Sequence, residues 1–89
     1  MKLKYQFVVK TVSGKPIAVA VGTDNERFNG MIKLNSSGEL IFKMLAEGDV
    51  TLEQILSSFT AAFGVTEQEA RPAVLGFLDH LRQNELLAE

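Results

Sequence analysis

The spacing of apolar residues along the chain changes close to residue 35. Before that point, apolar and polar residues alternate in short runs bounded by turn-forming residues, which predicts β-strands. After it, apolar residues recur every three or four positions, which predicts helices. The predicted strands span residues 5–12, 17–21 and 28–34, and the predicted helices span residues 36–47, 51–63 and 66–83. The pattern indicates an α+β fold in which a three-stranded antiparallel sheet is followed by a three-helix bundle. The 89 residues, 1–89, are expected to form a single domain.

The three predicted helices each begin at a capping box, where Ser or Thr is followed three residues later by Glu or Gln. We expect Ser36 to be the N-cap of the first helix, Thr51 of the second and Thr66 of the third. The first two helices are expected to end at Gly48 and Gly64, because glycine is the residue best suited to the left-handed position after a helix.

The third helix contains a proline beyond its first turn. Pro72 has no N–H and crowds the carbonyl group of Gln68, so the helix either begins later than Thr66 suggests or bends at Pro72. After this helix, Leu86 and Leu87 are expected to fold back as a short apolar lid or strand.

The third predicted strand is expected to lie at an edge of the sheet. A simple meander leaves it with one neighbour, so the N–H and C=O groups along its other side have no partner strand. Ile32 and Leu34 are expected to face the core, which places Met31 and Lys33 on the opposite face. Earlier in this strand, residues 29–30 (Asn-Gly) are consistent either with a bulge that protects the edge or with a place where a peptide approaches.

The third helix carries apolar residues on two adjacent faces. Val74 and Phe77 are expected to face the core. The second stripe consists of Arg71, Leu75, Leu78 and Arg82. Because a helix of this kind usually packs against two surfaces, the second stripe is expected either to line a groove beside the sheet or to form a homodimer contact or a domain-swapped assembly.

Composition narrows the class of protein. The absence of cysteine excludes disulfides, thiolate metal sites and a cysteine nucleophile, and it suits a reducing compartment. The longest apolar run, residues 17–21, is far too short to cross a bilayer, and no apolar signal core follows the basic start of the chain. We therefore expect a cytoplasmic protein with no membrane partner.

The residues that carry catalytic chemistry are also missing. His80 is the only histidine, so it has neither a second histidine nor a cysteine with which to share a metal ion. The serines lie in sequence contexts explained by capping or by a helix surface, and no glycine-rich phosphate loop is present. The sequence therefore predicts a protein that is not an enzyme and that needs no metal or cofactor.

Charge is distributed unevenly along the chain. Residues 1–34 contain six Lys and Arg against two Asp and Glu, whereas residues 35–89 contain three against nine. A winged-helix nucleic-acid-binding domain is one alternative for a chain of this size and element order. The third helix is disfavoured as a recognition helix because its acidic residues outnumber Arg71 and Arg82. A homodimeric protein-interaction domain is the other alternative.

The order of the segments and several residues resemble the PqqD-like family of small peptide-recognition domains, known as RiPP recognition elements. The resemblance is carried by residues 32–42 (Ile-Lys-Leu-Asn-Ser-Ser-Gly-Glu-Leu-Ile-Phe), which look like the family's segment with Leu-Asn, a following Gly and an Ile-aromatic pair. Further matches are Gly48 and residues 51–55, 63–65, 77–81 and 86–87. Pro72 departs from the pattern expected at its position in the helix.

The resemblance implies a winged-helix-like fold whose third strand accepts the leader segment of a ribosomally made precursor peptide as an added antiparallel strand. Peptide side chains would enter a groove between that strand and the third helix. The partners implied are this precursor peptide and a modifying enzyme, such as a radical-SAM maturase, with the domain itself a monomer or a weak homodimer. The peptide-binding residues expected on this basis are Phe28, Asn29, Gly30, Met31, Ile32, Lys33, Arg71, Val74, Leu75, Leu78 and Arg82.

Overall fold

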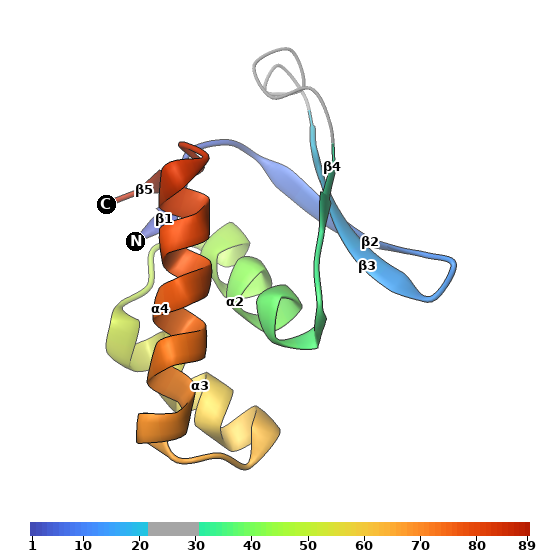
Figure 1. Cartoon of the computed structure of the whole chain (residues 1–89). Helices are drawn as coiled ribbons and strands as arrows, with labels where there is room; N and C mark the ends of the chain where they lie inside the picture. Colours follow the sequence, from blue (N-terminus) through green and yellow to red (C-terminus); the bar gives the residue numbers. More distant parts are fainter. Residues whose placement is uncertain (22–30) are drawn as a thin grey trace.

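A computed structural model of the chain describes residues 1–21 and 31–89 (Figure 1). Its strands are β1 (Lys2–Leu3), β2 (Phe7–Val12), β3 (Lys15–Ala20), β4 (Met31–Lys33) and β5 (Leu87–Ala88), and its helices are α2 (Ser36–Glu47), α3 (Leu52–Phe63) and α4 (Glu67–Gln83). Within the described residues, the predicted α+β arrangement of a three-stranded antiparallel sheet followed by three helices is confirmed. The first residues of the predicted third strand, 28–30, lie outside the described residues.

The main sheet has the order β2-β3-β4, with both pairs antiparallel. A two-residue turn joins β2 to β3, since Val12 pairs with Lys15 and both turn residues, Ser13 and Gly14, have positive φ. Such turns suit hairpins because their twist matches that of the strands. The turn is shorter than the gap between the predicted strands 5–12 and 17–21, because Lys15 and Pro16 already belong to β3.

A second, two-stranded ladder joins the beginning and the end of the described chain (Figure 1). β1 pairs antiparallel with β5, and the Lys4 amide donates to the Leu86 carbonyl at 2.8 Å. The expectation that Leu86 and Leu87 fold back as a short apolar lid or strand is confirmed: Leu87 lies in β5, Leu86 directly precedes it, and both side chains are buried. β1 was not predicted, because two residues are too few for an alternating pattern to be recognised.

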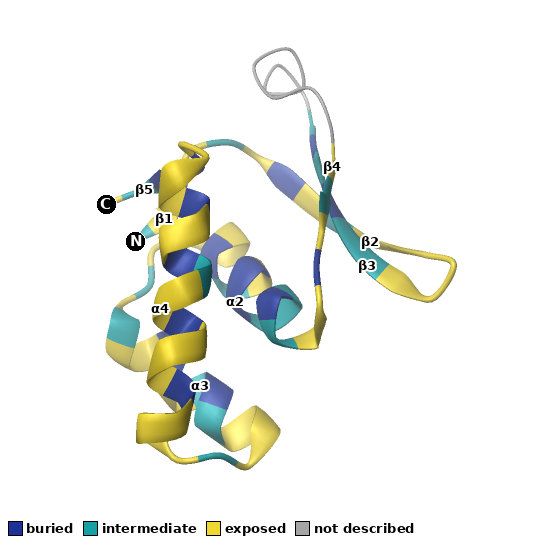
Figure 2. Cartoon of the chain, viewed as in Figure 1, coloured by how far each residue is buried: buried dark blue, intermediate teal, exposed yellow. Residues whose placement is uncertain are grey.

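The hydrophobic core lies between the helices and the inner face of the sheet, and the buried faces of α2, α3 and α4 turn toward one another (Figure 2). Phe42 of α2 is fully buried and meets Phe7 of β2 edge to face, with ring centroids 5.2 Å apart. This aromatic contact fixes the sheet to the first helix. From α4 the core receives Val74, Leu78 and Leu81, so one face of this long helix is committed to the interior.

A close approach of α2 to α4 depends on glycine. Gly38 is buried in the first turn of α2, and a Cβ atom there would lie 2.9 Å from the Phe77 ring of α4. Any larger residue would have to displace that ring. Gly38 therefore lets Phe77 pack directly on the start of α2, immediately after the chain leaves β4.

The predicted N-cap of the first helix was wrong by one residue. Asn35 occupies the N-cap position, and its side-chain oxygen accepts a hydrogen bond from the Gly38 amide at 2.7 Å. Ser36 is instead the first residue of the helix. The prediction failed because Asn and Ser are both good caps and adjacent in sequence. The capping boxes at Thr51 and Thr66 are confirmed.

The helix ends also differ in detail. Gly64 has the expected left-handed conformation, whereas Gly48 has φ 159° and ψ −167°, a backbone region that only glycine adopts freely. Because α4 begins at Glu67, directly after its Thr66 cap, the alternative of a later start is wrong. Pro72 lies inside the helix, where it provides no N–H for the carbonyl group of Gln68.

The corrected cap gives a direct test of stability. We expect Asn35→Ala to lower the free energy of unfolding by about 0.5–2 kcal/mol, because it removes the side-chain oxygen that accepts from the Gly38 amide. Ser36→Ala is the matched control, and we expect it to change stability much less. Urea denaturation followed by circular dichroism measures both variants; a larger loss in Ser36→Ala would reassign the cap.

Candidate functional site

Strand β4 forms an open edge in the part of the chain that the structure describes. It pairs with β3 on one side, and no described strand pairs with it on the other. The Leu34 amide donates to the Pro16 carbonyl of β3 at 3.0 Å. Because backbone groups in an antiparallel pair alternate in direction, Ile32 also points its N–H and C=O toward β3. The corresponding groups of Met31 and Lys33 therefore point out of the sheet edge.

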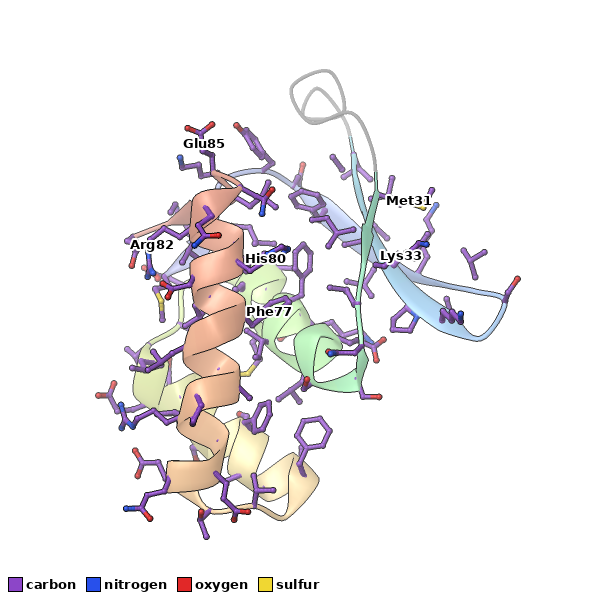
Figure 3. All side chains as sticks on the ribbon, in the orientation of Figure 1. Met31, Lys33, Phe77, His80, Arg82 and Glu85 are labelled. Carbon is purple, nitrogen blue, oxygen red and sulfur yellow. The ribbon has the colours of Figure 1, made fainter. Side chains whose placement is uncertain are left out.

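The side chains of β4 alternate between two faces as the sequence predicted. Leu34, just after the strand, is buried, and Ile32 is half-buried against the core. Met31 is 61% exposed, and Lys33 is exposed as well. Figure 3 shows Met31 and Lys33 pointing away from α4. The strand thus has an inner face toward the helices and an outer face toward solvent.

A hollow of about 300 Å³ separates β4 from the C-terminal end of α4. The lining residues are Met31, Ile32, Lys33, His80, Leu81, Asn84 and Leu86. We call this hollow the β4–α4 groove.

The β4–α4 groove has an apolar base and a polar rim. Leu81 and Leu86 are buried, whereas His80 and Asn84 are exposed, and the side-chain Nδ2 of Asn84 donates to the His80 carbonyl at 2.8 Å. The side chain of His80 points from α4 toward β4 (Figure 3). The groove can therefore accept a side chain that reaches Leu81 and Leu86 past a mostly polar rim, beside the outward backbone groups of β4.

The helix residues predicted for the groove lie elsewhere. Val74 and Leu78 are in the core, with exposed fractions of 0% and 2%. Arg71 and Leu75 line a separate hollow with Glu67, Gln68 and Pro72. His80 follows Leu75 by five positions on the helix, which turns the two side chains roughly 140° apart around the axis. Leu75, and Arg71 one turn before it, therefore face away from β4, whereas Leu78 faces the core.

The helix side of the groove was missed because its residues are polar. Phe77, His80 and Asn84 follow one another at helical spacing, but a search for apolar stripes does not select His80 or Asn84. His80 and Asn84 lie on the helix face that continues from Phe77, next to the core face. A search of that face without regard to polarity would have found both residues. Of the predicted strand residues, Phe28, Asn29 and Gly30 lie outside the described residues.

Arg82, also predicted for the groove, forms ion pairs at the end of the chain. Its guanidinium group donates to both carboxylate oxygens of Glu89, each at 2.8 Å, and to Asp79. Figure 3 shows Arg82 on the side of α4 away from β4. The hydrogen bonds from Arg82 lower the pKa of Glu89 below its ordinary value. Arg82 thus ties the residue after β5 to the last turn of α4.

The Arg82–Glu89 pair predicts a dependence on pH. Because the pKa of Glu89 is lowered in the folded state, the pair contributes fully above the ordinary Glu pKa and loses its contribution as the pH falls through the lowered value. In Arg82→Gln we expect the pKa of Glu89 to rise toward its ordinary value, measured by NMR titration of the carboxyl groups. Arg71→Gln, which removes the Arg71–Glu67 pair, is the control that should leave Glu89 unchanged.

The described residues offer neither a metal-binding cluster nor a buried polar side chain. They contain no group of three His, Cys, Asp or Glu side chains that could hold a metal ion. They also contain no buried polar or charged residue, so no side chain has the desolvated environment that usually perturbs a catalytic group. No helix in residues 1–21 and 31–89 is long and apolar enough to cross a membrane.

The described elements define the class: a winged-helix-like α+β fold with an open sheet edge beside its last helix. The chain belongs to the family described as coenzyme PQQ synthesis protein D (PqqD), because the model of that family matches residues 18–87. Among solved structures, the chain is similar to TbiB1 in complex with the TbiA(beta) leader peptide, with a TM-score of 0.70 and 21% sequence identity over 100% of both chains. A search of curated proteins found no match.

Proposed function

We propose that this chain is a non-catalytic peptide-binding module. It docks the leader segment of a ribosomally made precursor peptide as an added strand on β4 and presents it to a modifying enzyme, such as a radical-SAM maturase. In this proposal residues 1–89 act as one recognition domain. The observation that carries it is the open edge of β4, where Met31 and Lys33 direct backbone groups outward beside the β4–α4 groove.

Adding a strand to an open edge is an established way for a domain to bind an extended peptide. The two outward residues, Met31 and Lys33, offer two N–H and two C=O groups. Four such bonds at about 1 kcal/mol net would give roughly 4 kcal/mol. Ordering a disordered peptide costs about 2–5 kcal/mol. The backbone bonds are thus largely offset, so the net affinity must come from peptide side chains in the groove.

The comparisons support the same proposal. The chain belongs to the PqqD family, and its structural relative TbiB1 was solved with a leader peptide. On the strand side the proposed site keeps Met31, Ile32 and Lys33 as predicted. On the helix side we propose His80 and Asn84 at the rim, with Leu81 and Leu86 at the base, in place of the second stripe.

A proline at the open edge tests strand addition. Met31→Pro removes an outward N–H but none of the bonds between β4 and β3, so we expect a folded protein that binds peptide at least tenfold more weakly. The probe is a peptide selected from a random phage-displayed library against the wild-type chain, and fluorescence polarisation measures its affinity.

Thr11→Pro is the matched control for this experiment. The Val21 amide donates to the Gln6 carbonyl, and counting along the pairs from this bond places the Thr11 N–H at the opposite edge of the same sheet. We expect Thr11→Pro to bind the selected peptide as the wild type does. Equal binding by a folded Met31→Pro variant, or failure of the library to yield any ligand, would overturn the proposed function.

A single introduced thiol tests the groove. Because the chain contains no cysteine, His80→Cys and Leu75→Cys each carry one reactive group, on opposite sides of α4. We expect bound peptide to slow maleimide labelling of His80→Cys several-fold and to leave Leu75→Cys unaffected. Mass spectrometry follows the labelling. Protection of Leu75→Cys alone would move the site to the second stripe.

A further inference from the structure

Two rows of side chains on the outer face of the sheet end at the open edge of β4. In the first row, Lys10 pairs with Ile17, and Ile17 pairs with Lys33. The second row runs from Val8 through Val19 to Met31 and is entirely apolar.

A strand added beyond β4 extends each row by one residue. Because cross-strand neighbours on one face contact each other, the end of each row selects the chemistry of the added residue. The row ending at Lys33 favours an acidic neighbour, since Lys33 has no ion pair or hydrogen bond within the described residues. The row ending at Met31 favours an apolar neighbour, because Met31 is 61% exposed and its flexible thioether adapts to different shapes.

Between these rows, Ile32 lies on the inner face and pairs with Ala18. The residue of an added strand opposite Ile32 would share that inner face and point toward α4. It would not exchange backbone bonds with Ile32, whose N–H and C=O point to β3, and such pairs bring side chains closer together. This residue would enter the β4–α4 groove, where the buried side chains of Leu81 and Leu86 lie.

The direction of the added strand sets the order of these three residues. All described pairs in the sheet are antiparallel, and antiparallel pairing is slightly more stable than parallel pairing. In an antiparallel strand, the residue opposite Lys33 comes first, the residue opposite Ile32 second and the residue opposite Met31 third.

Resting on the function proposed above, we propose that this chain selects a leader segment with three consecutive residues in the order acidic, apolar, apolar. The acidic side chain pairs with Lys33 on the outer face. The middle side chain fills the β4–α4 groove, and the last one extends the apolar row that ends at Met31. The excess of basic residues in the sheet half of the sequence also attracts an acidic segment.

The test uses three synthetic peptides that differ only at the central triplet of a Ser/Thr host: Glu-Leu-Leu, Leu-Leu-Glu and Lys-Leu-Leu. Fluorescence polarisation at low salt measures their affinities for the full chain. We expect the wild type to bind Glu-Leu-Leu about fivefold more tightly than either of the others, the size expected of a favourable cross-strand pair.

A charge exchange makes the test specific to Lys33. In Lys33→Glu we expect the preference to reverse, so that Lys-Leu-Leu binds more tightly than Glu-Leu-Leu. Lys4→Glu is the matched control: it changes net charge equally, but Lys4 follows β1, away from the main sheet, and we expect the wild-type preference to persist. The preference should also weaken as salt is raised.

The possible failures can be told apart. If the peptides bind alike in wild type and Lys33→Glu, and Met31→Pro abolishes that binding, the proposed residue order is overturned while docking at the β4 edge stands. If Met31→Pro leaves the binding of all three peptides unchanged, or if no peptide binds in this or the library experiment, the proposed function fails, and the order fails with it. A preference that reverses equally in Lys4→Glu would reduce the effect to net charge and overturn the order.

Discussion

The hydrogen bond from the Leu34 amide to the Pro16 carbonyl fixes the register on which the proposed site depends. It directs the backbone groups of Ile32 toward β3 and those of Met31 and Lys33 outward. The same alternation sends the Ile32 side chain toward the core and leaves the other two in solvent. A shift by one residue would reverse every one of these assignments. Backbone pairing and side-chain chemistry at this edge are therefore set together.

Two neighbouring faces of α4 have different roles: one packs in the core, and the other lines the β4–α4 groove. Val74, Leu78 and Leu81 anchor it in the core, so its position relative to the sheet is fixed by packing. His80 and Asn84 are exposed and can then line the groove without taking part in the core. Because Gly38 lets the Phe77 ring sit on the start of α2, α4 packs closely on the helix that follows β4. The core thus positions the helix side of the groove.

The sequence predicted the elements well where local chemistry decides them, as in the capping boxes at Thr51 and Thr66 and the alternating faces of β4. It could not separate Asn35 from Ser36 as a cap, since both side chains can accept the same kind of hydrogen bond. On α4 the apolar pattern identified residues of the core and of the far side. The groove face is determined by where the sheet lies, which is a tertiary property that the periodicity of one helix does not contain.

Pro16 has a consequence for how sheet gives way to helix. Its carbonyl accepts from Leu34, but its ring nitrogen carries no hydrogen, so it returns no bond to the Leu34 carbonyl. Pairing between β3 and β4 therefore ends at this pair. The next residue, Asn35, caps α2, so the backbone groups that follow are available to the helix. The absence of an N–H group at Pro16 thus coincides with the point where the sheet ends and the helices begin.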